Sequence, residues 1–185
     1  MTQFRPASAV IVTATLLLFC GCASLHVSAK SYAPGRILVL PPRDLVQSAV
    51  PHPKGAGSGQ VFQNYLKTRF AESPFVLLTT DSTQFSGLEI ASKEQCLNEA
   101  RRMDADYCLQ VVLGEFQNAA PMTFRPDYVY LDRAMLYSVR SGEIVWQLAE
   151  PFRVQKGNIG NHLKLLDELA GMVSISIIEN ARTTP

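Results

Sequence analysis

The sequence has few histidines and cysteines and almost no net charge. Its 185 residues include three His, four Cys and one Trp, and 17 Lys and Arg stand against 16 Asp and Glu, for a formal net charge of +1. Proteins that bind nucleic acid usually carry a basic excess, so this balance excludes a nucleic-acid partner. His26, His52 and His162 are far apart, and no pair of His or Cys has the spacing of zinc ligands. We therefore expect no metal site and no bound cofactor.

The motifs that would mark an enzyme are also missing. The glycine-rich segment 55–59 precedes a predicted helix, but it lacks the Gly-Lys-Ser/Thr of a phosphate-binding loop. Ser58 lacks the outer glycines of a nucleophile elbow, Gly-x-Ser-x-Gly. Asp104 and Asp106 stand at a predicted turn, where aspartate is favoured because its side chain caps the backbone. We therefore expect no catalytic residues and predict that the protein is not an enzyme.

No apolar run near the amino terminus is long enough to cross a membrane as a helix. A spanning helix needs roughly 20 predominantly apolar residues. The apolar segment 9–19 is about half that length and is interrupted by Thr13 and Thr15. A short apolar segment that follows a single positive residue, here Arg5, is typical of the hydrophobic region of a signal peptide.

The apolar segment ends in Phe-Cys-Gly-Cys-Ala-Ser at 19–24, which resembles the lipobox of bacterial lipoproteins. The signal peptidase of that class needs a small residue before the cysteine, and Gly21 before Cys22 meets this need, whereas the preceding cysteine follows a bulky phenylalanine. The resemblance implies acyl chains, such as palmitate, on Cys22, and stable anchoring takes more than one chain. Ser24 is not the Asp that retains such proteins in the inner membrane, so the resemblance implies the outer membrane, with the protein facing the periplasm.

We divide the chain into three parts. Residues 1–21 are the expected signal peptide, and residues 22–34 are the expected lipid anchor and tether, because Leu25 to Pro34 shows no hydrophobic periodicity. Residues 35–182 are then a single α/β periplasmic domain, which is long enough to bury a core without disulfides.

Two cysteines remain for pairing after signal removal and lipidation, namely Cys96 and Cys108. Their separation along a predicted helix and strand allows a bridge, and the periplasm is oxidising. The alternation in the strand places Tyr107 and Leu109 on the more apolar face and points Cys108 to the opposite side. A disulfide and two buried free thiols are therefore both open.

Hydrophobic periodicity predicts five strands and three helices. The expected strands are 36–40, 75–79, 107–116, 127–139 and one that runs from 144 past Phe152; the expected helices are 60–72, 92–103 and 161–180. Ser92 and Gln95 form a capping box, and Ser141-Gly142 is the turn of an antiparallel hairpin. The proline- and glycine-rich segment 41–59 should have no regular structure.

Two predictions depend on the hydrophobic period assigned to a segment: the faces of one strand and the nature of the last segment. In strand 127–139, strict alternation places Tyr128, Tyr130, Ala134 and Leu136 on one face and Val129, Leu131, Met135 and Tyr137 on the other. In the last segment, Val173, Ile175 and Ile177 alternate with serines as in a strand, so 172–180 is open between helix and strand.

Four phrases carry a family resemblance: a strand ending in Leu-Pro-Pro, an amphipathic helix, Ala-Arg-Arg-Met-Asp-Ala-Asp-Tyr-Cys-Leu, and the hairpin Leu-Tyr-Ser-Val-Arg-Ser-Gly-Glu-Ile-Val-Trp. They resemble periplasmic lipoprotein domains grouped around the TolB amino-terminal and curli-secretion-channel fold, and within that group an outer-membrane lipoprotein family of unknown function. The resemblance covers most of 36–180. With the predicted elements it implies an α/β (α+β) fold, with one mixed sheet of about five strands, helices mainly on one face, an antiparallel hairpin and a C-terminal helix.

The anchor and the missing catalytic constellation together favour a non-enzymatic accessory, assembly or binding factor whose partner is another envelope protein. Tyr128, Tyr130 and Trp146 are the candidate partner surface, since aromatic side chains are enriched at interface anchors. The alternatives are a lipoprotein hydrolase or ligand-binding protein that uses the loop 45–59, and a subunit of a self-assembling secretion complex.

Overall fold

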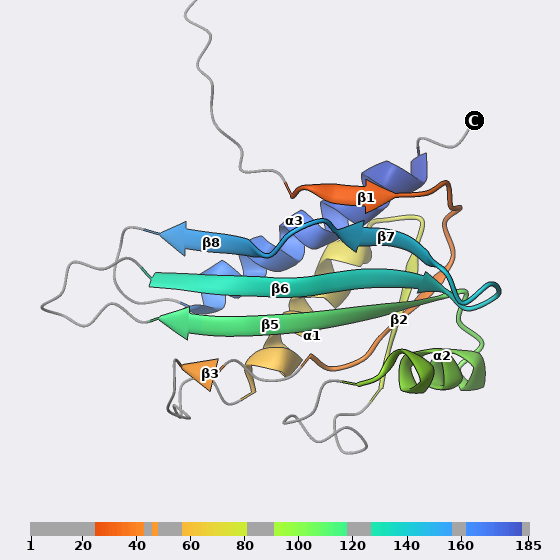
Figure 1. Cartoon of the computed structure of the whole chain (residues 1–185), viewed down its shortest axis with the longest axis horizontal. Helices are drawn as coiled ribbons and strands as arrows, with labels where there is room; N and C mark the ends of the chain where they lie inside the picture. Colours follow the sequence, from red (N-terminus) through yellow and green to blue (C-terminus); the bar gives the residue numbers. More distant parts are fainter. Residues whose placement is uncertain are drawn as a thin grey trace, which may run out of the picture.

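The computed structural model describes residues 25–42, 46–47, 57–80, 91–117, 127–156 and 162–182, and the signal segment and Cys22 lie outside them. Eight strands in these ranges form one mixed sheet with three helices packed on it (Figure 1). The strands are β1 (Val27–Ala29), β2 (Arg36–Val39), β3 (Val46–Gln47), β4 (Val76–Thr79), β5 (Tyr107–Gln117), β6 (Asp127–Ser138), β7 (Ile144–Leu148) and β8 (Phe152–Lys156); the helices are α1 (Ser58–Phe70), α2 (Lys93–Arg102) and α3 (His162–Arg182). The predicted α+β class is confirmed, with more strands than expected.

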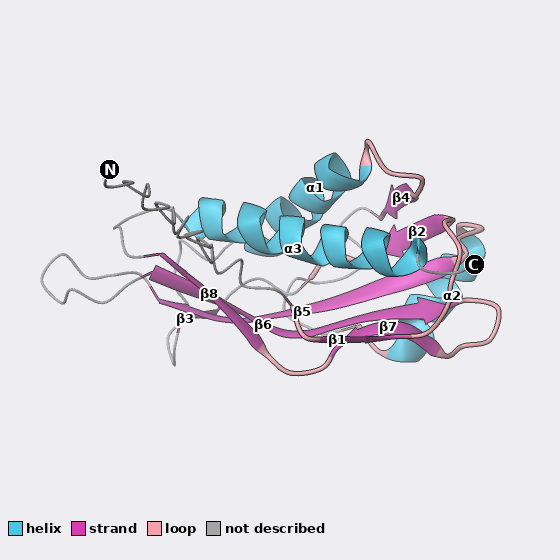
Figure 2. Cartoon of the chain, turned by 90° about the horizontal axis from the view of Figure 1, so that it is seen from above, coloured by secondary structure: helices cyan, strands magenta, loops and turns pink. Residues whose placement is uncertain are grey.

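Strand β2 is buried on both faces of the sheet. It pairs in parallel with β4 on one side and with β5 on the other. Ile37 and Val39 belong to the larger core, with α1 and α3, whereas Leu38 and Leu40 belong to a smaller core with α2. Because successive side chains of a strand point to opposite faces, α2 must lie on the face opposite α1 and α3, as Figure 2 shows.

The direction of the two crossovers explains why α2 is alone on its face. The chain passes from β2 through α1 to β4, and then from β4 through α2 back across β2 to β5. Crossovers between parallel strands are almost always right-handed, so two crossovers in opposite directions place their helices on opposite faces. Helices therefore cover mainly one face, as expected, and α2 is the exception.

The C-terminal segment is a helix, and the strand alternative for 172–180 is wrong. Ala170, Val173 and Ile177, at helical spacing, are fully buried in the larger core, whereas Ile175 is 56% exposed. The helix packs beside α1, and the Arg69 guanidinium bonds both carboxylate oxygens of Asp167, at 2.7 and 2.8 Å, across the two helices.

The expected tether 22–34 is partly wrong, because its second half belongs to the fold. Strand β1 pairs antiparallel with β7, placing Val27 opposite Leu148. Tyr32 is buried, and its hydroxyl donates a hydrogen bond to the Ile177 carbonyl of α3 at 2.7 Å. These contacts are made with residues more than a hundred positions away, so no local periodicity announces them.

Replacing Tyr32 with phenylalanine should lower the free energy of unfolding by about 1 kcal/mol, because one buried hydrogen bond is lost. Burial raises the pKa of Tyr32. A raised folded-state pKa means that the neutral phenol stabilises the fold below about pH 10 and that this contribution is lost as pH rises further. Urea unfolding at pH 7 and above pH 10 should show a smaller alkaline loss for Tyr32→Phe. An equal loss in both proteins would contradict the assignment.

Strand β6 carries a bulge that the expected alternation of 127–139 did not include. Val112 pairs with Arg133 but Leu113 pairs with Leu131, so Asp132 is an extra residue. A bulge shifts the side-chain alternation by one position. The core residues are consequently Val129, Leu131, Ala134 and Leu136, and the other face carries Tyr128, Tyr130, Met135 and Tyr137. The prediction that Tyr128 and Tyr130 share a face with Ala134 and Leu136 was therefore wrong.

Opposite the bulge, the expected final strand is divided into β7 and β8. Strand β7 pairs with Met135–Tyr137 of β6 and β8 pairs with Asp127–Leu131, so the interruption at 149–151, which contains Pro151, faces the bulged part of β6. The hairpin between β6 and β7 is confirmed. Its turn needs a left-handed residue, which is Gly142 with φ of 70°.

Candidate functional site

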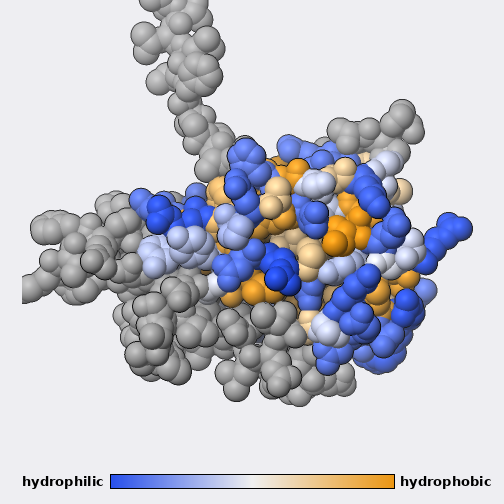
Figure 3. Space-filling model, in the orientation of Figure 1, coloured by the Kyte–Doolittle hydropathy of each residue, from blue (hydrophilic) through white to orange (hydrophobic). Residues whose placement is uncertain are grey.

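The best candidate for a functional surface is the sheet face that carries α2, which is the face turned toward the viewer in Figure 1. From the edge of α2 outward, this face presents Tyr128, Tyr130, Met135 and Tyr137 of β6 and Arg153 of β8, which we call the tyrosine face. Among the described elements, only α2 packs on this side of the sheet. The space-filling view shows hydrophobic and hydrophilic groups side by side there (Figure 3).

The outer part of the tyrosine face is a small cluster of two rings and a cation. The rings of Tyr128 and Tyr130 meet edge to face with centroids 5.3 Å apart. The Arg153 guanidinium lies 5.8 Å from the centroid of the Tyr128 ring. Both tyrosines are half-buried, so their rings remain accessible. Tyrosine and arginine are enriched at protein interfaces, because they combine apolar area with a hydrogen-bonding tip.

Trp146 does not belong to this surface, and its assignment to the partner surface is wrong. Its side chain is fully buried, and its indole N–H donates to the Ser176 hydroxyl of α3 at 3.1 Å. The register that places Trp146 opposite Leu136 sends both side chains into the larger core, whereas Tyr128 and Tyr130 point the other way.

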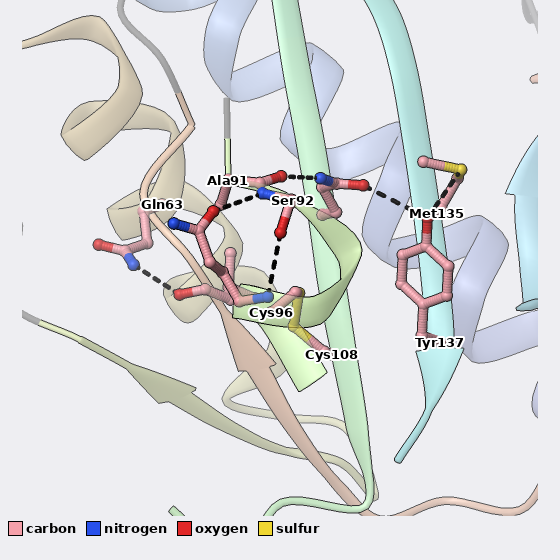
Figure 4. Close-up of a disulfide and its surroundings, with 10 residues drawn as sticks. Gln63, Ala91, Ser92, Cys96, Cys108, Met135 and Tyr137 are labelled. Atoms are coloured by element: carbon pink, nitrogen blue, oxygen red, sulfur yellow. Dashed lines mark hydrogen bonds between the residues drawn. A yellow bond between two sulfur atoms is a disulfide. The ribbon is translucent and has the colours of Figure 1, made fainter. Parts of the chain in front are cut away.

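The inner end of the tyrosine face is joined to α2 by a disulfide and a chain of hydrogen bonds (Figure 4). The structure bridges Cys96 of α2 to Cys108 of β5, with Cα atoms 6.1 Å apart. The Tyr137 hydroxyl donates to the Gln110 side-chain oxygen at 3.4 Å, and the Gln110 amide donates to the Ala91 carbonyl. Burial raises the pKa of Tyr137, so its hydroxyl stays a donor.

The strand alternation predicted for Cys108 is correct, and the position of α2 explains why it does not prevent the bridge. Cys108 does point away from Leu109, as expected, and lies in the smaller core instead of the larger one. This orientation would separate the two cysteines only if the helix that carries Cys96 packed on the Leu109 face. Because α2 packs on the opposite face, the same alternation brings the two sulfurs together. Crossover direction was the signal that could have found this.

Beside α2 the same side of the molecule is hollowed, with a volume of about 390 Å³. Three segments line the hollow: the strand β1 region, the start of α2, and the turn before β7 with β7 itself. The lining residues are Ser28, Lys30, Lys93, Gly142, Glu143, Ile144, Val145 and Gln147. No sequence motif links these segments, so sequence reasoning missed the hollow.

Two ammonium groups and one carboxylate set the charge of the hollow. The Lys30 ammonium lies 2.9 Å from a Glu143 carboxylate oxygen, and both side chains are 63% exposed. The hydrogen bond from Lys30 is the main reason that the pKa of Glu143 lies below its ordinary value, and the nearby charge of Lys93 adds to it. The Lys93 ammonium stands 5.7 Å from the centroid of the Tyr137 ring. The hollow therefore has one positive charge in excess.

The residues weighed for catalysis have structural surroundings. Asp104 binds the Arg36 guanidinium, and the Asp106 carboxylate accepts the Arg36 backbone N–H at 2.8 Å, so both hold the start of β2. Ser58 is 2% exposed at the start of α1, and His52 lies outside the described residues. Strand β3 lies within the segment expected to lack regular structure.

Neither a metal centre nor a membrane-spanning helix is found in the described part of the chain. Within those ranges, three or more His, Cys, Asp or Glu side chains nowhere gather closely enough to hold an ion. Of the helices described there, none combines the length and the apolar character that a membrane span requires.

Neither a protein-family model nor a curated protein matches the sequence. Among solved structures, the PelC dodecamer from Paraburkholderia phytofirmans is 13% identical, with 88% of this chain and 99% of that chain covered and a TM-score of 0.55. Protein XCC0632 from Xanthomonas campestris is 11% identical, with coverage of 86% and 95% and a TM-score of 0.52. Lipoprotein GNA1162 from Neisseria meningitidis is 16% identical, with coverage of 82% and 100% and a TM-score of 0.47.

The PelC and XCC0632 structures support the predicted α+β architecture and give no support to the narrower resemblance to TolB and the curli secretion channel. At such low identities the likeness extends to the fold alone, so the chain shares the fold of these bacterial proteins.

Proposed function

We propose that this protein is a lipid-anchored component of the bacterial envelope that acts without catalysis, as an accessory or assembly factor that binds another envelope protein. Acyl chains on Cys22 would hold it at the outer membrane, facing the periplasm. The observation that carries the proposal is the cluster of the half-buried Tyr128 and Tyr130 with the exposed Arg153, on a sheet face that the larger core does not use.

The position of β1 limits the distance between the lipid anchor and the start of the fold. Because β1 begins at Val27, only five sequence steps separate it from Cys22. An extended chain covers at most about 3.6 Å per residue, so the start of β1 would stay within roughly 20 Å of the lipid anchor. The partner would therefore be a protein that lies at the membrane surface.

Capture of the partner tests the proposal. Crosslinking in cells followed by mass spectrometry should identify one reproducible envelope protein, and Cys22→Ala should lose it because the protein is no longer anchored. Replacing both Tyr128 and Tyr130 with alanine should reduce capture at least about tenfold, because hot-spot aromatics contribute 2 kcal/mol or more each. The double substitution Lys164→Ala and Glu168→Ala, on α3, is the matched control and should leave capture unchanged. Undiminished capture by the tyrosine variant would contradict the proposed surface.

Self-assembly is the second candidate, and the fold likeness favours it. A protein with this fold has been crystallised as a dodecamer, namely PelC. The present sheet ends in short strands, β1 and β4, each paired on one side only among the described elements, and Val76 of β4 is 56% exposed. Such edges can pair with another chain. Crosslinks confined to copies of this protein, kept in the tyrosine variant and lost on Val76→Lys, would favour this candidate over a separate partner.

A further inference from the structure

We infer that the hollow beside α2 binds a carboxylate-bearing segment of the partner, with Lys93 as the main contact. The inference rests on the proposed function for the source of the segment, and it assigns that function a second, chemically distinct contact.

Lys93 is the unmatched cation of the hollow. Of the ion pairs among the described residues, those of the hollow join only Lys30 to Glu143, and Lys93 has no carboxylate within pairing distance in that set. Its ammonium is instead positioned by the Tyr137 ring below it. A cation over an aromatic face is held electrostatically while its remaining hydrogen-bond donors stay free.

The position of Lys93 is determined by the surrounding structure. Lys93 is the first residue of α2, directly after Ser92, whose capping box with Gln95 fixes the start of the helix. The Cys96–Cys108 bridge joins the first turn of α2 to β5. Tyr137 is itself held by its hydrogen bond to Gln110. The ammonium therefore belongs to a pre-organised arrangement, which lowers the entropy that binding would cost.

The rest of the lining selects for an extended, partly apolar segment with an acidic group. Ile144 supplies apolar surface, and Ser28 and Gln147 supply hydrogen-bonding groups. Lys30 and Glu143 are both largely exposed, so the hollow is open on one side instead of enclosing a small molecule. An incoming carboxylate would meet Lys93 first and would compete with Glu143 for Lys30. This competition predicts opposite effects for removing the cation and removing the anion.

The test uses the full-length protein in detergent micelles and two dye-labelled pentapeptides. One is acetyl-Ala-Asp-Ala-Glu-Ala-amide, and its matched control carries Asn and Gln in place of Asp and Glu. Fluorescence anisotropy should show tighter binding of the acidic peptide. Lys93→Gln should weaken that binding about two- to fivefold, the range measured for exposed charge pairs, and Glu143→Gln should strengthen it by a similar factor. Raising the salt concentration should remove the difference between the peptides.

Three results would overturn the inference: equal binding of the two peptides, unchanged binding in Lys93→Gln, or an equal loss in Lys164→Gln, which removes one lysine from α3 far from the hollow. Partner capture in cells separates this inference from the proposed function. If Lys93→Gln captures the partner normally while the tyrosine variant does not, the hollow is not a contact but the proposed function stands. If neither variant captures a partner and peptide binding behaves as expected, the two surfaces act together.

Discussion

Trp146→Ala should lower the free energy of unfolding by about 3 to 5 kcal/mol, the range for truncating a buried aromatic side chain. The indole is fully buried between the sheet and α3, in register with Ala29 of β1 and Leu136 of β6. Its loss leaves a cavity at the contact of three elements and removes the hydrogen bond to Ser176. Because whole domains are stable by only about 5 to 15 kcal/mol, this single change removes a large share of the total.

Urea unfolding followed by circular dichroism measures this effect. Trp146→Phe keeps most of the apolar volume and should cost much less, whereas Tyr130→Ala, on the half-buried face, should cost under about 1 kcal/mol. The two positions therefore separate stability from binding: Trp146 acts on the fold and Tyr130 on the partner. If the Trp146→Ala protein is stable but no longer binds its partner, Trp146 belongs to the interface, and its placement in the core is contradicted.

Reducing the bridge between Cys96 and Cys108 should lower the free energy of unfolding by about 3 kcal/mol, because the closed loop, with a sequence separation of 12, no longer restricts the unfolded chain. The effect is concentrated on α2. The core beneath this helix is small, with Leu38, Leu40, Cys96, Ala100, Ala105 and Cys108 as its buried members. Few apolar contacts therefore hold α2 to the sheet, and the bridge should carry much of the attachment.

Thermal unfolding with and without dithiothreitol tests the bridge. The wild-type protein should lose about 6 to 12 °C of melting temperature on reduction, from roughly 2 to 4 °C per kcal/mol for a domain of this size. The double variant Cys96→Ala, Cys108→Ala should already melt at the lower temperature, and dithiothreitol should not change its melting temperature. An unchanged wild-type melting temperature under full reduction would contradict the role of the bridge. Peptide binding should also weaken on reduction, because Lys93 begins the same helix.

The elements with the clearest local patterns were predictable. The capping box of Ser92 and Gln95, the helical spacing of Phe62, Leu66 and Phe70, and the turn at Gly142 all depend on residues a few positions apart, and the structure confirms each. Strand β1 had no such pattern. It is held by pairing with β7, which lies more than a hundred residues later.

Of the three residues predicted for the partner surface, two lie on the candidate face and one does not. Tyr128 and Tyr130 were selected for their residue type and do lie on the face away from the larger core. Trp146 was selected by the same reasoning and is in the core. Alternation could not separate them, because the extra residue Asp132 reverses the faces within one strand, and a Cβ at Gly114 of the neighbouring strand would collide with its carboxylate.

The sequence by itself determined the class of fold and the positions of the main helices and strands, because hydrophobic period, caps and turns depend on short segments. The lipid anchor at Cys22 stays a prediction. Only the tertiary structure decided which face of the sheet each side chain occupies. The handedness of the crossovers placed α2 on the face opposite α1 and α3, and a bulge exchanged the two side-chain faces partway along β6. Both effects arise from pairings between distant segments. Those pairings bring Cys96 to Cys108 and Lys93 to the hollow, so the candidate site is a property of the assembled sheet.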